Sequence, residues 1–136
     1  MKTPYQSVSP GRAFTLLEMT IVIMVVLALI GTGLFVSKKM DEWKLARQAS
    51  ESLRSVYSAQ RMYLADNPTA TVASLTPTLL IPYLPDKAAS MPTVTSLTGT
   101  SLSILVNVFP PVINAGSGTT YDPSGNSKDS LWDVGE

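Results

Sequence analysis

The sequence predicts an α+β fold in which a long N-terminal α-helix packs on a small C-terminal antiparallel β-sheet. Three observations lead to this prediction. Residues 14–36 carry a single charged side chain, Glu18, no proline occurs from Phe14 to Asn67, and the spacing of apolar residues changes to two after Thr93. A chain of 136 residues has room for about one domain. We therefore expect one helix followed by one small sheet.

The overall composition excludes several functions. Ten basic and ten acidic residues give a formal net charge of zero, which is not the basic footprint of a nucleic-acid-binding protein. The chain has no His and no Cys. Histidine-based acid–base catalysis, cysteine nucleophiles, disulfides and ordinary zinc, haem and iron–sulfur sites are therefore excluded. No convergent catalytic set is apparent, and we expect no enzymatic activity.

A polar segment, residues 1–13, precedes the apolar block of residues 14–36. At about 1.5 Å per residue the block spans roughly 35 Å, enough for a bilayer core of about 30 Å. A buried core helix is the alternative, but so small a domain cannot surround so long an apolar cylinder. Basic residues flank the block on both sides, at Lys2 and Arg12 and at Lys38, Lys39 and Lys44. The positive-inside rule therefore gives no orientation.

Residues 37–67 continue the helix in amphipathic form. One mainly apolar stripe recurs at spacings of three and four: Ala46, Ala49, Leu53, Val56, Gln60 and Tyr63. The motif Asp66-Asn67-Pro68 then disfavours further helix, because the residue before a proline avoids the helical region. We expect one helix from Phe14 to about Ala65, with its second half docked on a partner surface.

Residues 68–136 are expected to form a small β-rich domain. Thr76-Pro77 is typical of a helix start and predicts a single turn through Leu80, interrupted at Pro82. Period-two patterns predict a weak strand at 94–97, a strand at 102–108 and short edge strands at 112–114 and 119–121. Gly99-Thr100 predicts a hairpin connection. In the polar tail, Trp132 is either an anchor to the sheet or a contact between subunits.

Glu18 is the most informative residue, because a carboxylate in an apolar helix is costly and is by default a functional hypothesis. If the chain is cut before Phe14, the new α-amino group lies four residues, about one turn, from Glu18. Side-by-side helices shifted along their axes could then pair the Glu18 of one copy with the amine of the next. The alternative is that Glu18 lies at headgroup level in a plain signal anchor.

The run Ala13-Phe14-Thr15-Leu16-Leu17-Glu18, after a short basic leader and before an apolar helix, resembles the class III signal of type IV pilins and type II secretion pseudopilins. The resemblance is specific over Arg12 to about Val36 and only architectural beyond. It implies that a prepilin peptidase cuts between Ala13 and Phe14 and methylates the Phe14 amine, and that Glu18 is the family's acidic fifth mature residue. Ala13 departs from the glycine that the family typically has before the cut.

The resemblance also implies a place and partners. The chain would be a single-pass precursor in the cytoplasmic (inner) membrane with its leader in the cytoplasm. It would then enter a periplasmic or cell-surface filament. Its partners would be copies of itself or related pilins, the prepilin peptidase and an inner-membrane assembly platform. The competing hypothesis is a single-span, membrane-anchored binding or sensor module that does not polymerise.

Two charged sets remain. The tail loosely resembles the acidic C-terminal loop of major pseudopilins, which binds calcium, and it offers oxygen ligands at Asp122, Asn126, Asp129 and Asp133. The spacing is not that of an EF-hand, and a solvated loop of Asx-turns is the alternative. Arg47, Arg54 and Arg61 recur every seven residues and form a row on one side of the helix. That row either meets acidic groups of a neighbouring subunit or is ordinary surface charge.

Overall fold

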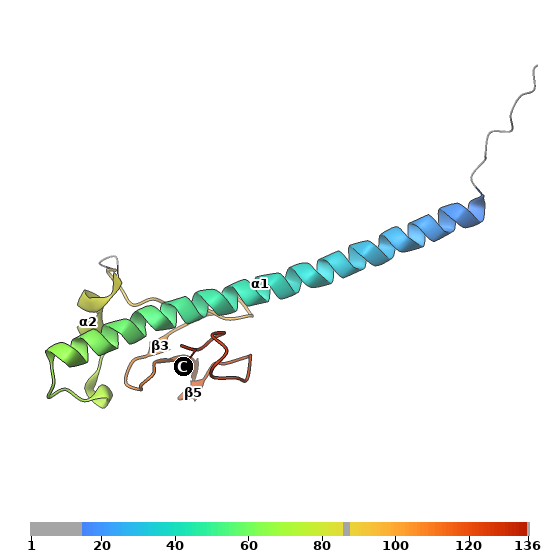
Figure 1. Ribbon diagram of the computed structural model, residues 1–136. Helices are drawn as coiled ribbons and strands as arrows, with labels where there is room; N and C mark the ends of the chain where they lie inside the picture. Colours follow the sequence, from blue (N-terminus) through green and yellow to red (C-terminus); the bar gives the residue numbers. More distant parts are fainter. Residues whose placement is uncertain (1–14, 86–87, 136) are drawn as a thin grey trace, which may run out of the picture. The chain divides into compact units, whose positions relative to one another are not determined.

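The computed structural model describes residues 15–85 and 88–135 of the chain and confirms the α+β layout. The chain divides into two compact units, residues 1–38 and 39–136. Helix α1, Leu16–Asp66, contributes to both, and every other helix and strand belongs to the second unit (Figure 1). The predicted helix is therefore confirmed over the described residues, while its expected first residue, Phe14, lies outside them.

Local chemistry determines both ends of α1. At the start, the hydroxyl Oγ1 of Thr15 accepts a hydrogen bond of 3.2 Å from the backbone N–H of Glu18. At the end, the carbonyl of Tyr63 accepts bonds from both the backbone N–H and the side-chain amide of Asn67, at 2.9 and 3.0 Å. Asn67 thus closes the last turn just before Pro68, where the sequence predicted the stop.

The first unit presents the apolar part of α1. The most apolar stretch of this helix is long and apolar enough to cross a membrane, and none of it is buried by other parts of the chain. Its two threonines satisfy their hydroxyls within the helix: Thr20 donates to the carbonyl of Leu17 at 2.8 Å and Thr32 to that of Ala28 at 2.9 Å. Gly31 and Gly33 do not interrupt the helix.

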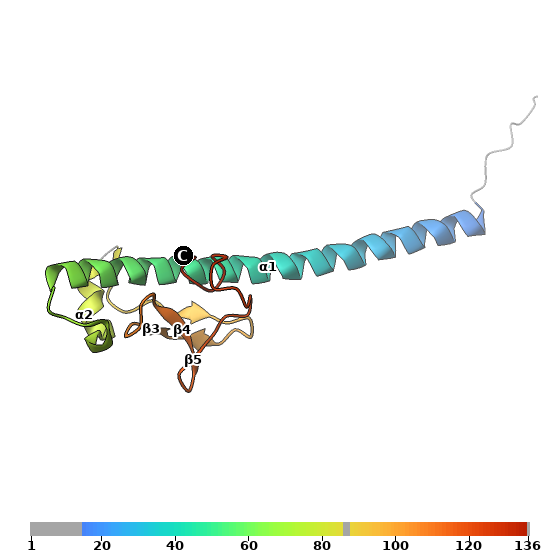
Figure 2. The same cartoon turned by 60° about the horizontal axis from the view of Figure 1, so that its bottom comes forward.

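The core of the second unit forms on the predicted stripe of α1. Leu53, Val56 and Gln60 are fully buried, and Ala46 and Ala49 are nearly so. Figure 2 shows the strands lying alongside this second half of α1, as Figure 1 does from another side. The helix packs against buried apolar residues from the short helical segment, the strands and the tail: Leu75, Leu80, Leu84, Val94, Ile104, Val106, Ile113, Trp132 and Val134. Burying a side chain such as Leu53 contributes about 1.5–3 kcal/mol.

The segment after α1 forms three short helical turns: η1 (Val72–Ser74), α2 (Pro77–Leu80) and η2 (Ile81–Tyr83). Helix α2 begins at Pro77 after Thr76, as predicted. Helix α2 ends at Leu80, before Pro82, as predicted, and the chain continues in the separate turn η2, where Pro82 lies near the start and is tolerated. Leu80 and Leu84 from this segment enter the core.

The strands form two small antiparallel sheets. β1 (Val94–Thr95) pairs with β2 (Ser101–Leu102) as the predicted hairpin. The second sheet has the order β3 (Ile104–Leu105), β4 (Val112–Gly116), β5 (Thr119–Thr120). Positive φ angles at Ser117 and Gly118, of 53° and 76°, form the tight turn between β4 and β5.

The prediction of one continuous strand over residues 102–108 is wrong. Ser103 separates β2 from β3, which belong to different sheets, and the extended ladder ends at Leu105. The end at Leu105 follows from Gln60 of α1, whose side-chain nitrogen Nε2 donates to the carbonyls of Val106 and Val108 at 2.7 and 3.0 Å. These carbonyls bind the helix instead of a neighbouring strand.

The C-terminal tail is attached to α1. The guanidinium of Arg54 donates to the carbonyl of Val134 at 3.0 Å and to the hydroxyl of Ser130 at 2.8 Å. The backbone N–H of Trp132 donates to the carbonyl of Ala46 at 3.3 Å. The indole of Trp132 is only 4% exposed and meets the ring of Tyr121 edge-on, with centroids 5.2 Å apart. Trp132 is therefore a buried anchor within this chain.

Candidate functional site

The expected processing site, Ala13 and Phe14, lies outside the described residues, which begin at Thr15. The structure places Glu18 in the first turn of α1, three residues after the Thr15 cap. Thr15-Leu16-Leu17-Glu18 matches the capping box, in which a hydroxyl caps the third helical N–H and an acidic residue occupies that third position. The Ser/Thr-x-x-Glu spacing before an apolar run was the signal for this role, which the sequence analysis did not use.

The Glu18 side chain is solvent-exposed in the single chain. It is the only titratable side chain between Leu16 and Val36. Within the part of the chain that the structure describes, the ion pairs are Lys39–Glu42 and Lys44–Asp41, and Glu18 takes part in neither. A carboxylate near a helix N-terminus is favoured by the helix dipole. Glu18 thus contributes locally to the helix start and still offers a charge to another molecule.

The three arginines at seven-residue spacing have different surroundings. Arg54 binds the C-terminal tail, as described above. The guanidinium carbon of Arg47 lies 5.2 Å from the ring centroid of Trp43, and that of Arg61 lies 5.8 Å from the ring centroid of Tyr57. The row is therefore not one uniform charged surface. Arg54 thus bonds to the tail, whereas Arg47 and Arg61 each stack on an aromatic ring of α1.

Three of the four candidate calcium ligands form turns within the C-terminal loop. Oδ1 of Asp122 accepts hydrogen bonds from the backbone N–H and the hydroxyl of Ser124, at 3.1 and 2.7 Å. Oδ1 of Asn126 accepts from the N–H of Lys128 at 3.3 Å, and Oδ1 of Asp129 from the N–H of Leu131 at 2.9 Å. Each is a side-chain oxygen that binds the N–H two residues ahead, the geometry of an Asx-turn.

Asp133 differs from the other three. Both of its carboxylate oxygens are buried and, among the described residues, neither has a hydrogen-bond partner of good geometry. Burial raises the pKa of Asp133 above its ordinary value, and the neighbouring Asp129 carboxyl raises this pKa further. Backbone N–H groups of Gly135 and Ser130 oppose the increase in pKa. An unpartnered buried carboxylate is the feature of the loop that most needs a counter-charge or a proton.

Asp122 and Asp133 line one cavity of about 90 Å³, with Trp132 among its other walls. The structure therefore brings two of the four predicted ligands to one small space. Across residues 15–85 and 88–135, no group of three or more His, Cys, Asp or Glu side chains lies close enough to hold a metal ion. Calcium usually takes six to eight oxygen ligands. The calcium site remains a prediction. Asp122 and Asp133, which line the same cavity, are the two predicted ligands that the structure brings together.

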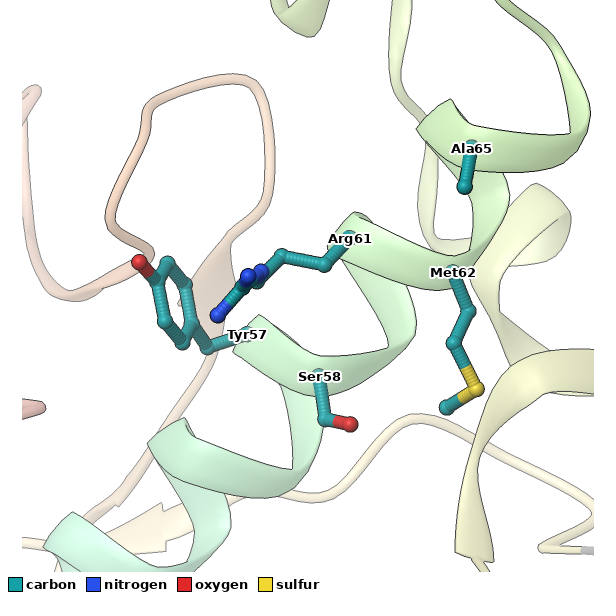
Figure 3. A pocket seen from close by; sticks show the side chains of 5 residues that line it. All are labelled: Tyr57, Ser58, Arg61, Met62 and Ala65. Carbon is teal, nitrogen blue, oxygen red and sulfur yellow. The ribbon is translucent and has the colours of Figure 1, made fainter.

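An open groove of about 390 Å³ lies on the exposed side of α1, and Figure 3 shows its lining residues: Tyr57, Ser58, Arg61, Met62 and Ala65. Arg61 extends toward the Tyr57 ring in this view. Tyr57 also contacts the ring of Phe109, with centroids 5.0 Å apart. A surface of this kind, with aromatic rings, a methionine and one cation, is suited to binding rather than to acid–base chemistry.

We compared the chain with models of protein families, with curated proteins and with solved structures, and none of them matches it.

Proposed function

We propose that this chain is a structural subunit of a type IV pilus or a type II secretion pseudopilus. In this proposal a prepilin peptidase removes residues 1–13 and methylates the amine of Phe14. The mature subunit then leaves the membrane and joins a filament through packing of its N-terminal helices. The resemblance of the Ala13-to-Glu18 run to a class III signal supplies the family, and the structure supports the proposal through one feature.

That feature is the first part of α1, which remains uncovered by the chain's own domain. A helix that is apolar all round is stable only in lipid or among other helices. None of its most apolar stretch is buried, although the same helix contributes to a well-packed core after Lys39. An anchor before assembly and a filament core after assembly both fit such a segment.

Glu18 then sets the register between neighbouring helices in the proposed filament. Its carboxylate is the single charge of the apolar part and is exposed. Two opposite charges about 4 Å apart attract by about 4 kcal/mol at an effective dielectric near 20. A wrong axial shift would leave that carboxylate buried without a partner, which is strongly unfavourable. The α-amino group of Phe14 is the partner that this proposal requires.

A single-span binding or sensor module is the second candidate. Ala13, in place of the family's glycine before the cut, favours it, because an uncut precursor has no Phe14 amine to pair with Glu18. The open groove beside Arg61 would then be its binding surface. Both candidates share the membrane anchor and differ in cleavage and polymerisation.

One experiment with two readouts tests the proposal. Membranes of cells that process other prepilins are extracted, the intact mass of the chain is measured, and incorporation into sheared filaments is followed. The expected mass lacks Met1–Ala13 and carries one added methyl group. A full-length mass in such cells would contradict the filament function and favour the anchored module.

The same preparation separates the two roles of Glu18. Glu18→Ala removes the charge together with the side chain that the capping box places at the third helical position, whereas Glu18→Gln keeps a side chain that suits this position and removes only the charge. We expect both variants to insert in the membrane and both to be lost from filaments. If Glu18→Gln assembles normally while Glu18→Ala does not, Glu18 acts only by capping α1, and the register mechanism is wrong.

A further inference from the structure

A second exposed cluster lies at the start of the second unit, on α1. Met40 and Trp43 are three residues apart and about half exposed, at 50% and 49%, although the domain's core forms on the same helix. Arg47, one turn later and also exposed, holds its guanidinium carbon 5.2 Å from the Trp43 ring centroid. We call Met40, Trp43 and Arg47 the collar cluster. It combines an apolar surface, an aromatic ring and a cation.

Several of the charged side chains around the collar cluster are paired with one another. Lys39 pairs with Glu42 at 2.8 Å, and Lys44 pairs with Asp41 at 3.4 Å. Both acidic side chains of this stretch therefore have a lysine partner. Among the residues that the structure describes, no carboxylate forms an ion pair with Arg47. Arg47 is the one charged residue of the collar cluster and is available to an external anion, while the neighbouring Lys38 also forms no ion pair in the part of the chain that the structure describes.

Sequence distance places the collar cluster close after the apolar block. Trp43 follows Val36 by seven residues, about two helical turns or roughly 10 Å along a helix. Helical side chains generally lean toward the helix N-terminus, which for Met40 and Trp43 is the end of α1 that carries the apolar block in the sequence. Tryptophan is enriched where the hydrocarbon region of a bilayer meets water, because its ring is apolar and its N–H is polar.

We propose that the collar cluster docks on the headgroup layer of a membrane, with Met40 and Trp43 entering the interface and Arg47 binding anionic lipid phosphate. Arginine suits this role, because its planar guanidinium binds phosphate with two parallel hydrogen bonds and stacks on aromatic rings. The inference rests on the membrane anchoring in the proposed function, which both candidate functions share. It is independent of whether the subunit polymerises.

The test uses the full-length chain in vesicles of phosphatidylcholine alone or mixed with phosphatidylglycerol, carrying brominated acyl chains that quench nearby tryptophan. The chain has two tryptophans, and Trp132 is buried, so the Trp43→Phe variant measures the background that is subtracted. We expect strong quenching of Trp43 by bromines near the headgroups and weaker quenching by deeper bromines. The quenching should increase with phosphatidylglycerol content and decrease with salt.

Arg47→Gln is the decisive variant. A basic side chain near an anionic surface contributes about fivefold to the docking equilibrium, so this variant should weaken docking on phosphatidylglycerol vesicles about fivefold, and Lys38 should account for part of the dependence that remains. Arg61→Gln is the matched control, because Arg61 is also an exposed arginine stacked on an aromatic ring but lies fourteen residues further along α1. It should behave as the wild type.

The remaining outcomes overturn the inference at different points. If the protein floats with vesicles but Trp43 is not quenched, or if Arg47→Gln and Arg61→Gln respond equally, the collar cluster does not bind headgroups. If Trp43 is shielded from bromine quenching only at high protein-to-lipid ratios, a second copy of the chain covers the collar cluster instead of the headgroups. If the protein does not float with vesicles at all, the membrane anchoring itself is wrong, and the proposed function fails with it.

Discussion

Replacing Asp133 with Asn should stabilise the second unit at neutral pH. The wild-type carboxylate has two buried oxygens without partners of good geometry, next to the carboxyl of Asp129. Leaving a buried polar group unsatisfied costs about 1–3 kcal/mol. An Asn side chain is neutral, can donate to Asp129, and can accept from the backbone N–H groups that already face this position. We expect a gain of about 1–3 kcal/mol, and each kcal/mol raises Tm by about 4–8 °C for a domain of this size.

The pH dependence of this effect has a definite sign. The folded-state pKa of Asp133 is raised, so the folded state binds this proton more tightly than the unfolded state does. The resulting stabilisation is fully present below the unfolded pKa of about 3.9 and is lost as pH rises through the raised pKa. The advantage of Asp133→Asn should therefore be largest at neutral pH and shrink as the pH approaches 4.

The assay is thermal unfolding of the full chain in detergent, followed by tryptophan fluorescence, in excess chelator and in millimolar calcium. Asp122→Asn is the control, because Asp122 lines the same cavity but already accepts two bonds from Ser124, so its loss should not stabilise. If calcium binds here, wild-type Tm should rise with calcium and both variants should lose that response. A lower Tm for Asp133→Asn in chelator at pH 7 would refute the reasoning.

Two further predictions concern how α1 holds the rest of the domain. Arg54→Met should release the tail, so that Trp132 becomes exposed and its fluorescence emission shifts to longer wavelength. The cost in stability should be only about 1 kcal/mol, because Arg54 is solvent-exposed. An Arg61→Met variant with the same emission shift would contradict this. Gln60→Leu should remove the donor from the buried bond to the Val106 carbonyl and from the part-buried bond to the Val108 carbonyl, and destabilise by about 2–4 kcal/mol in chemical denaturation, with faster amide exchange in residues 104–113. An unchanged exchange rate there would show that the glutamine does not hold this segment.

The helix and its burial could be predicted closely, because they depend on patterns within one element. The absence of proline, the stripe from Ala46 to Tyr63 and the stop before Pro68 are all local, and the structure follows each of them. The start of α1 was equally local. Thr15 and Glu18 match a known capping pattern, which is visible in the sequence alone. The same Glu18 is also the lone charge of the apolar block, and that property suggests a functional role instead of a capping role.

The interruption of the predicted 102–108 strand could not be found in the same way. The alternating pattern from Leu102 to Val108 is a good strand signal by itself, and nothing within those residues predicts that β3 ends at Leu105. The strand ends there because Gln60, more than forty residues earlier, binds the carbonyls of Val106 and Val108, and the sequence around Gln60 indicates only that it belongs to the buried stripe of α1. A polar side chain on a buried stripe needs hydrogen-bond partners, but the local sequence does not reveal which carbonyl groups accept its bonds.

The arginine row shows why the candidate site was harder to predict than the fold. Heptad spacing correctly places Arg47, Arg54 and Arg61 on one side of α1, but the function of each depends on what the rest of the chain places beside it. Arg54 is engaged by the tail, so its charge is part of the domain's own structure. Arg47 and Arg61 each stack on an aromatic side chain and have no carboxylate partner among the described residues. Within the row, Arg47 and Arg61 are therefore the two arginines whose charge is available to an external anion, and Arg47 lies nearer to the apolar block along α1.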